Sequence, residues 1–264
     1  MLIAHISDLH VLESPDPSNG SLAGNAARLH ETIASICALQ RAPDIAVITG
    51  DISHEGTEDD YAFCRSLLEK LPCPFLVIPG NHDDRKIMRQ VFPIAGADAD
   101  PDFYQFDCNA FPLRIIGIDT LEPGQVGGSI RPEKLDWIRE ALLHSEKPVL
   151  ILMHHPPYPF GHADNPDMQC TDGSDALAEM IRKNARVAAI LCGHLHLMTS
   201  SIFADVTALS APSVAPAFKL DIGDSKLTGW CPSSPAFALH FLDRNAALTT
   251  HIIRVDECKF VTPL

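Results

Sequence analysis

The chain has 264 residues, 46% of them hydrophobic, and a formal net charge of −14 at pH 7. This length and hydrophobic content are enough for one large core, and the acidic charge argues against duplex DNA or another nucleic-acid polymer as a partner, because surfaces that follow phosphates are basic. No apolar run reaches the roughly 20 residues of a membrane-spanning helix, so we expect no membrane association.

The first residues, 1–8, lack the basic stretch and the small-residue cleavage site of a signal peptide, and their apolar run predicts the first strand. Eight cysteines are scattered along the chain without the paired spacing of a zinc site or a disulfide framework. Several of them, including Cys37, Cys64 and Cys192, lie inside apolar patterns. We therefore expect buried, reduced thiols in a cytoplasmic protein.

Strand and helix signals alternate along most of the chain, which is typical of an α/β fold. Apolar runs rich in branched residues predict buried strands. After the strand at 1–8, these runs cover 44–49, 75–78, 113–118, 149–153 and 187–192.

Apolar residues at spacings of three and four predict helices between these strands. One helix begins with Thr57–Asp60, which resembles a capping box, and another with Pro132, a residue favoured in the first helical turn. The predicted helices cover 26–36, 57–71, 84–92, 132–142 and 174–184.

Three regions depart from this alternation. Residues 93–112 are irregular and interrupted by proline, and the proline-rich residues 155–173 predict a long loop. In the last quarter of the chain, short alternating runs such as 236–241 predict β-hairpins. We therefore expect a core at 1–200 and a C-terminal segment at 201–264 that completes a second sheet.

Polar side chains able to bind a metal follow five of the predicted strands. The carboxyl ends of parallel strands meet at one edge of a sheet, where ligands bind in open α/β folds. Asp51 is central, because its carboxylate has two oxygens, enough to bridge two cations. Asp8 and His10 are two residues apart, so in an extended strand both side chains point the same way. The five strand ends are Ser7–His10, Gly50–Asp51, Gly80–Asp83, Met153–Pro156 and Gly193–His196.

Taken singly, each of these strand ends has an ordinary explanation. An Asp-x-His pair is common on protein surfaces, and Asn and Asp often hydrogen-bond their own backbone in turns. Five such strand ends in one chain, several of them with a glycine that permits a tight turn, favour a metal centre instead.

The order of these motifs resembles the calcineurin-like metallophosphoesterase signature, from residue 1 to about residue 200. Pro79–Asp84 and Met153–Pro157 are similar to the branch that contains class III cyclic nucleotide phosphodiesterases and bacterial glycerophosphodiesterases. The resemblance implies an α/β (α+β) sandwich of two mixed β-sheets flanked by helices, with the catalytic core at 1–200. It also implies that 201–264 forms a cap or a dimerisation element, and hence a homo-oligomer.

Carried over position by position, the resemblance implies a centre of two metal ions. Family members contain Fe, Mn or Zn, and nitrogen and oxygen ligands suit these metals. Of the adjacent His154 and His155, the first is the implied ligand, and the second packs or hydrogen-bonds beside it. The implied ligands are Asp8, His10 and His196 for one metal, Asn81, His154 and His194 for the other, and Asp51 as the bridge.

A small phosphodiester is the implied substrate. Two metals about 3.5–4 Å apart would lower the pKa of a shared water, and the hydroxide would attack phosphorus while the cations neutralise the phosphoryl oxygens. The resemblance places Asn81, His82 and His194 at the phosphate, with His82 stabilising the transition state or protonating the leaving group. For Asp83 two roles stay open, orientation of His82 or the N-cap of the next helix. Asp119 is expected to serve in a turn or in structure.

Substrate choice is less sharply indicated. The proline-rich loop with His162 and the stretch at 13–25 are expected to line the pocket. Phe218, Trp230 and Phe237 would either pack in the core or supply a stacking face for a base.

The sequence thus predicts a metal-dependent phosphodiesterase that acts on cyclic nucleotides first, either 3′,5′- or 2′,3′-cyclic AMP. A glycerophosphodiesterase or a broad phosphoesterase is the alternative. A non-catalytic scaffold of the same fold is disfavoured because no ligand position of the signature is missing, and a nuclease is disfavoured by the acidic charge.

Overall fold

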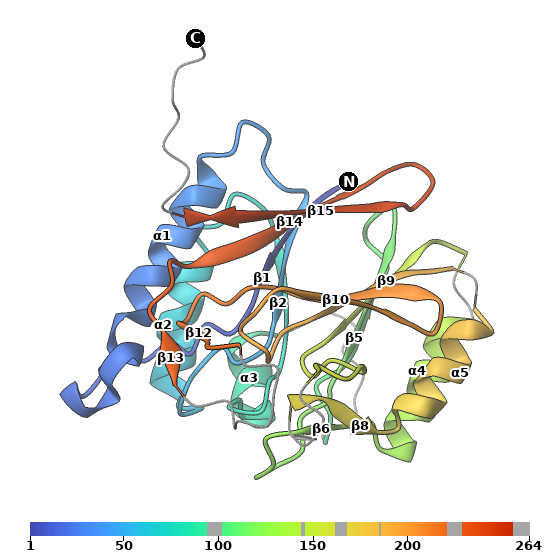
Figure 1. Ribbon diagram of the computed structural model, residues 1–264, viewed down its shortest axis with the longest axis horizontal. Helices are drawn as coiled ribbons and strands as arrows, with labels where there is room; N and C mark the ends of the chain where they lie inside the picture. Colours follow the sequence, from blue (N-terminus) through green and yellow to red (C-terminus); the bar gives the residue numbers. More distant parts are fainter. Residues whose placement is uncertain (94–101, 144–145, 162–167, 185, 221–228, 256–264) are drawn as a thin grey trace.

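Two β-sheets pack face to face in the computed structural model, with helices on the outer face of each (Figure 1). The structure describes residues 1–93, 102–143, 146–161, 168–184, 186–220 and 229–255. Parallel strands form the centre of each sheet, and antiparallel strands extend both. The predicted α/β sandwich of two mixed sheets flanked by helices is confirmed.

The first sheet has five strands in the order β15-β14-β1-β2-β3. Neighbours among β1, β2 and β3 are parallel, and β14 and β15 continue the sheet in antiparallel pairing. The bounds are β1 (Leu2–Ile6), β2 (Ile45–Thr49), β3 (Phe75–Ile78), β14 (Ala236–Leu242) and β15 (Leu248–Arg254).

The second sheet has six strands in the order β10-β11-β9-β7-β5-β4. The four central strands are parallel, and β10 and β4 close the two edges in antiparallel pairing. The bounds are β4 (Phe106–Cys108), β5 (Arg114–Ile118), β7 (Val149–Met153), β9 (Val187–Cys192), β10 (Thr199–Phe203) and β11 (Val206–Ser210).

Helices connect most of the parallel strands. Thr57 caps the second helix, because its side chain accepts a hydrogen bond from the backbone of Asp60, as the capping-box pattern predicts. The helices are η1 (Pro17–Gly24), α1 (Asn25–Cys37), α2 (Glu58–Leu68), α3 (Arg85–Val91), α4 (Pro132–Leu143) and α5 (Ser174–Arg182). Two small ribbons pair β6 (Gly128–Ser129) with β8 (Cys170–Asp172) and β12 (Ala217–Phe218) with β13 (Trp230–Cys231).

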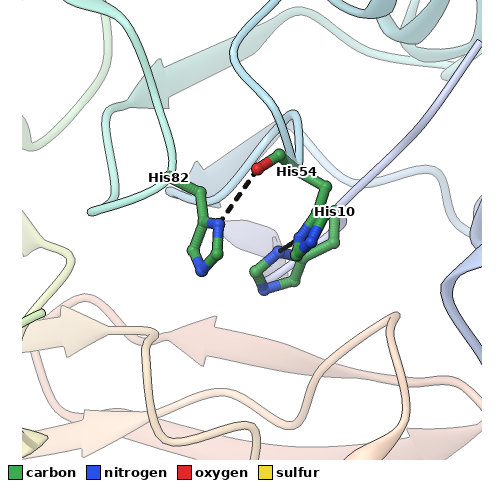
Figure 2. A group of neighbouring side chains, drawn as sticks. All are labelled: His10, His54 and His82. Carbon is green, nitrogen blue, oxygen red and sulfur yellow. Dashed lines mark hydrogen bonds between the residues drawn. The ribbon is translucent and has the colours of Figure 1, made fainter. Parts of the chain in front are cut away.

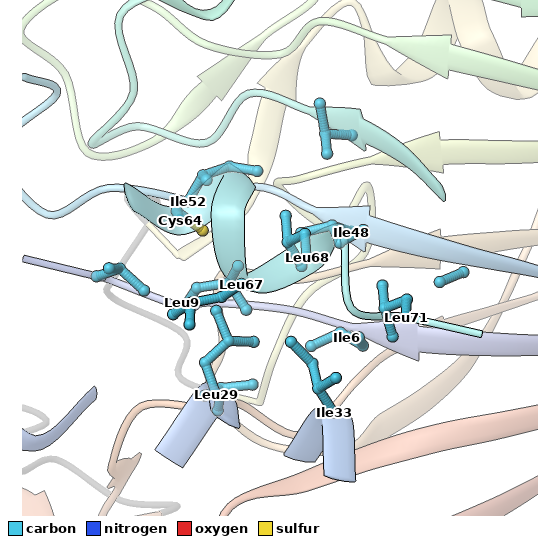
Figure 3. Close-up of a cluster of buried hydrophobic side chains, with 14 of the residues drawn as sticks. Ile6, Leu9, Leu29, Ile33, Ile48, Ile52, Cys64, Leu67, Leu68 and Leu71 are labelled. Carbon is cyan, nitrogen blue, oxygen red and sulfur yellow. The ribbon is translucent and has the colours of Figure 1, made fainter. Parts of the chain in front are cut away.

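Alternate residues of each central strand enter different cores. In β2, Ala46 and Ile48 pack against α1 and α2, as Figure 3 shows for Ile48, whereas Ile45 and Val47 face the second sheet. A third core lies between the second sheet and the helices α4 and α5. Because each large side chain buried in this way contributes about 1.5–3 kcal/mol, the strands are firmly held, and so are the residues that directly follow them.

The predicted strands and helices up to residue 192 are present, with ends shifted by three residues or fewer. The stretch at 93–112, predicted to be irregular, contains β4, and the predicted loop at 155–173 ends in β8. Both short strands depend on partners elsewhere in the chain, so no local pattern marks them. The C-terminal segment contributes strands to both sheets, and its role as a cap or dimerisation element stays a prediction.

The cysteines within the described residues are free thiols. Cys64 and Cys192 are buried as expected, but Cys37 is exposed, because it follows Ile36 and turns off the buried face of α1. Among the described helices, none combines the length and the hydrophobicity needed to cross a bilayer.

Candidate metal centre

The loops that follow β1, β2, β3, β7 and β9 bring polar side chains together at one end of the sandwich. β1, β2 and β3 run parallel in one sheet, and β7 and β9 run parallel in the other, so the carboxyl ends of each set share an edge. Within each of two sets, the ligand atoms lie within 4.8 Å of one another: Asp8, His10, Asp51 and His196 in one set, and His154, His155 and His194 in the other.

Several residues of this cluster have left-handed backbone angles, which are costly for side chains other than glycine. The φ angles of Asp8, His10 and Asp51 are 53°, 44° and 50°, and those of His194 and His196 are 68° and 52°. The extended geometry expected for Asp8 and His10 is therefore wrong. The chain has left β1 at this point, and the backbone N–H groups of both residues donate to carbonyls of the loop after β2. Strain gathered at one place indicates a functional site.

Two glycines allow the loops to approach one another. A Cβ atom on Gly80 would collide with the carboxylate of Asp51, and one on Gly50 would collide with the ring of His154. Gly50 also has a φ of 95°, which other residues rarely adopt. The glycine that precedes a polar strand end is thus required for close packing as well as for the turn.

Asp51, a member of the first set, lies between the histidines of that set and His154 of the second. Its Oδ2 atom is 3.4 Å from His10 Nε2 and also 3.4 Å from His154 Nε2. On the His10 side, His196 Nε2 lies 3.1 Å from His10 Nε2 and 3.6 Å from Asp8 Oδ1. A bridging ligand requires such a position.

The other side of Asp51 contains an amide oxygen and two further histidines. Asn81 Oδ1 lies 3.2 Å from His154 Nε2, and the His194 ring lies 5.0 Å from the His154 ring. His155 lies nearby, but its ring nitrogens bond the Thr120 hydroxyl at 2.8 Å and a backbone carbonyl at 2.9 Å. His154 therefore directs a ring nitrogen into the cluster, whereas both nitrogens of His155 are used elsewhere.

The atoms that converge here are hydrogen-bond acceptors. His154 Nδ1 lies 2.6 Å from the Thr49 carbonyl oxygen, and His196 Nδ1 lies 2.9 Å from that of Pro216. A carbonyl oxygen only accepts, so each Nδ1 carries a proton, and in the neutral form of each ring Nε2 presents a lone pair to the cluster. Asp8 Oδ2 is buried and has no hydrogen-bond partner among the described residues.

Acceptors that face one another are stabilised by a cation between them. Imidazole nitrogens with carboxylate and amide oxygens form a donor set that suits Fe, Mn or Zn. The second ring nitrogen of a metal-binding histidine usually donates to a carbonyl or a carboxylate, as in His154 and His196 here. The donor set and its outer hydrogen bonds therefore fit a metal centre.

Burial and the two carboxylates set the protonation of the cluster. Burial raises the pKa of Asp8. Burial acts in the same direction on Asp51, but the charges of His154 and His10 outweigh it and hold the pKa of Asp51 well below its usual range. Burial lowers the pKa of His10, which favours the neutral ring that binds metals. Burial opposes the charge of His154 too, yet Asp51 prevails and raises the pKa of His154 to about 9. A proton on this ring thus balances Asp51 in the absence of a cation, and a bound cation would displace it.

A further histidine, His54, lies against His10 and His82 (Figure 2). His82 Nδ1 donates to the backbone carbonyl of His54 at 3.0 Å, and the two rings stack with centroids 4.8 Å apart. The Nδ1 atoms of His10 and His54 lie 3.2 Å apart. His54 thus contacts His10 through its ring, and His82 through both its ring and its backbone carbonyl.

Reasoning from the sequence missed His54. It lies three residues after Asp51, in a loop that no apolar pattern marks. The one available signal was a histidine in the loop that directly follows the expected bridge.

Asp83 takes neither of the two roles left open for it. The N-cap of α3 is Asp84, whose side chain accepts from the backbone three residues later. The Asp83 carboxylate instead accepts from the backbone of Gly80 and of the loop after β2, and from the Tyr61 hydroxyl. The hydrogen bond that orients His82 is the one that its Nδ1 donates to the His54 carbonyl. Asp83 therefore holds the loop after β2 and the loop after β3 together. Burial raises the pKa of its carboxyl to about 6.

The remaining candidates fall into different environments. Asp119 is structural, as expected, because it forms ion pairs with Arg85 and Lys134.

Phe237 is fully buried in the core, so a stacking role for it is wrong. Phe218 and Trp230 lie beside the metal-centre cluster. His162, in the proline-rich loop, lies outside the described residues.

The sequence model of the calcineurin-like phosphoesterase family matches residues 1–198. The match covers most of the chain and contains all the strand ends of the cluster. The chain therefore belongs to the calcineurin-like phosphoesterase family.

Two curated relatives match almost the whole chain. A probable glycerophosphodiester phosphodiesterase, GpdQ, of Arcobacter nitrofigilis is 31% identical over 95% of this chain and 92% of its own length. A 3′,5′-cyclic adenosine monophosphate phosphodiesterase, CpdA, of Pseudomonas aeruginosa is 26% identical over 98% of this chain and 92% of its own.

A solved structure extends the likeness in fold. A dimetal phosphatase from Danio rerio superposes with a TM-score of 0.70 at 16% identity, over 94% of this chain and 98% of that one. At this identity the likeness concerns the fold alone.

Proposed function

We propose that this member of the calcineurin-like phosphoesterase family is a metal-dependent phosphodiesterase that hydrolyses small phosphodiesters, cyclic nucleotides first. One observation carries the proposal. Asp51 Oδ2 lies 3.4 Å from an imidazole nitrogen on each of two sides, in a cluster of buried metal-binding side chains. Relatives named as cyclic nucleotide phosphodiesterases support the substrate class.

In this proposal the two sets of side chains hold one cation each. Asp51 lies between them and contributes to both sites. When bound, the cations supply Lewis acidity, which lowers the pKa of water and neutralises phosphoryl charge. We propose Fe, Mn or Zn for these ions. One would be held by Asp8, His10 and His196, and the other by Asn81, His154 and His194.

The protein's own groups then divide the remaining work. His82 uses Nδ1 to bond the His54 carbonyl, so its Nε2 is the ring nitrogen available to a substrate. With the ring protonated on both nitrogens, the proton on Nε2 passes to the leaving alkoxide oxygen and leaves the neutral imidazole. The Asn81 amide places its oxygen toward His154, which leaves its nitrogen to donate to a phosphoryl oxygen. Burial of Asp8 and Asp51 keeps bulk water away from the charges.

A second candidate function uses the same residues. The Arcobacter nitrofigilis relative, named as a probable glycerophosphodiester phosphodiesterase, is 31% identical over 95% of this chain. Glycerophosphodiesters are therefore the alternative substrate class. A cytoplasmic location and a homo-oligomer formed through residues 201–264 are further proposals, and a monodisperse monomer in light scattering would overturn the second.

The experiment is a comparison of kcat/KM on manganese-loaded protein. The substrates are 3′,5′-cyclic AMP, 2′,3′-cyclic AMP, a glycerophosphodiester and a simple phosphomonoester. We expect a preference for one cyclic nucleotide. A preference for the glycerophosphodiester would transfer the assignment to the alternative, and no turnover of any substrate by metal-loaded protein would overturn both.

A further inference from the structure

An aromatic pair lies directly against the candidate metal ligand His196. The Phe218 ring lies 4.5 Å from the His196 ring, and the Trp230 ring lies 5.2 Å from it. His196 itself is almost fully buried, but the Trp230 side chain is 42% exposed. A large apolar surface thus meets solvent one ring away from the proposed phosphate site.

The pair is built by a short β-ribbon. Phe218 of β12 and Trp230 of β13 are cross-strand partners, and their rings stack with centroids 4.6 Å apart and planes inclined by 26°. The residue before β12, Pro216, accepts the Nδ1 hydrogen bond of His196 at 2.9 Å. The same segment therefore orients a ligand of the centre and carries the aromatic surface, so the two have a fixed spacing.

The shape of this surface selects among substrates. A base stacks on a flat aromatic face, and such stacking contributes substantially to the binding of nucleotides. A quaternary ammonium group is held instead by rings that surround it. The Phe218 and Trp230 rings stack on one another and do not surround a space. The half-exposed Trp230 ring thus offers a flat face and not a cage, which favours a planar ring over a choline headgroup.

We infer that Phe218 and Trp230 form a binding subsite for the planar base of a nucleotide diester whose phosphate lies at the metal centre. The inference rests on the proposed function and narrows its substrate class to diesters that carry a heteroaromatic ring. His196 adjoins both the phosphate position and the ring position, with the sugar of the substrate spanning the two.

The kinetic test compares two substrates in the same variants. Replacement of Trp230 by leucine keeps an apolar side chain but removes the stacking face. In Trp230→Leu we expect the ratio of kcat/KM for 3′,5′-cyclic AMP to kcat/KM for glycerophosphoethanolamine to fall about tenfold, mainly through KM for the nucleotide. Trp230→Phe should restore part of the ratio. The matched control is Phe241→Leu, an exposed aromatic residue at the far end of β14, opposite Leu2.

A binding test gives a readout separate from turnover. In a Trp137→Phe background Trp230 is the one remaining tryptophan. Adenosine monophosphate should quench its fluorescence, and ribose 5-phosphate should not. Equal quenching by both compounds would contradict stacking of the base.

Other outcomes distinguish a failure of this inference from a failure of the proposed function. An equal loss on both substrates in Trp230→Leu would show that the ribbon only positions His196, and an unchanged ratio would remove the ribbon from recognition. A selective loss with glycerophosphocholine would identify a quaternary ammonium site. Each result overturns the inference while the wild-type protein still hydrolyses diesters. Absence of any diester turnover in the wild type would instead overturn the proposed function.

Discussion

Asp51 and Asp119 are both buried carboxylates at the carboxyl ends of strands, yet their surroundings differ. Asp119 forms ion pairs with Arg85 and Lys134 and accepts from the backbone of Tyr104 and Leu121. Its negative charge is balanced by cations of the protein itself. Asp51 instead lies among imidazole nitrogens that are acceptors when neutral.

The difference separates a structural carboxylate from the one that we propose as functional. A buried charge is tolerated where fixed partners compensate it, and the Arg85–Asp119–Lys134 network meets that condition. The Asp51 cluster combines converging lone pairs, the orphaned Asp8 Oδ2 and left-handed backbone angles. Such a site becomes balanced through cations from solution.

The largest expected effect concerns catalysis. Asp51→Ala should lower kcat/KM for diesters by about 10³-fold or more, because it removes the group shared by both metal positions and with it several kcal/mol of transition-state stabilisation. Steady-state kinetics and metal analysis of the purified variant measure the effect. The matched control is Asp119→Asn, which should keep its bound metal. Full activity in Asp51→Ala would contradict the assignment.

The next largest effect concerns stability, and here the residue replaced is Asp119, with Asp51 left intact. Asp119→Ala leaves Lys134 buried without its carboxylate, so the free energy of unfolding should fall by about 3–5 kcal/mol. Denaturant unfolding measures this loss. Asp136→Ala, which breaks an exposed ion pair with Arg139, should have little effect. A loss in Asp119→Ala as small as in this control would show that the network is not required for folding.

A smaller effect tests the contact between His54 and His10. His54→Ala removes the ring that hydrogen-bonds His10 Nδ1 but keeps the carbonyl that accepts from His82. Loss of such an outer partner typically lowers metal affinity or activity by about 10- to 100-fold. Titration of metal-free protein with Mn²⁺ measures the affinity. His30→Ala, an exposed histidine of α1, is the control, and equal affinities in the two variants would remove His54 from the centre.

The smallest effect is a pH dependence of the structural network. Burial lowers the pKa of Lys134 to about 8, whereas an unfolded lysine titrates near ~10.4. Between these values the unfolded chain binds more protons, so the free energy of unfolding should rise with pH, by roughly 2 kcal/mol from pH 7.5 to 9.5.

The variant Lys134→Met isolates this contribution. In this variant the free energy of unfolding should lack the rise of roughly 2 kcal/mol between pH 7.5 and 9.5 that Lys134 contributes. Denaturant unfolding of variant and wild type at the two pH values measures the difference. Parallel pH profiles for the two proteins would show that Lys134 keeps an ordinary pKa.

The sequence predicted most of what depends on local pattern. Apolar runs marked the central strands, and because parallel strands share an edge, the polar residues after β1, β2, β3, β7 and β9 were expected together. Their positions in the structure agree with this expectation, and the assignment of each one as a ligand stays a prediction.

What the sequence did not predict depends on loop conformation and on distant partners. The left-handed turns at Asp8 and His10 arise from hydrogen bonds to the loop after β2. The roles of His54 and Asp83 depend on how that loop meets the one after β3. Likewise, the ribbon of β12 and β13 is only two residues long in each strand, too short for a periodic signal.

The central claim is that the cluster around Asp51 holds two catalytic cations. The most direct measurement is a titration of metal-free protein with Mn²⁺ in which bound metal and hydrolysis of 3′,5′-cyclic AMP are followed together. We expect two ions per chain, with hydrolysis reaching its plateau as the second site fills. Folded protein that binds no manganese, or hydrolysis that is complete with one ion bound, would contradict it.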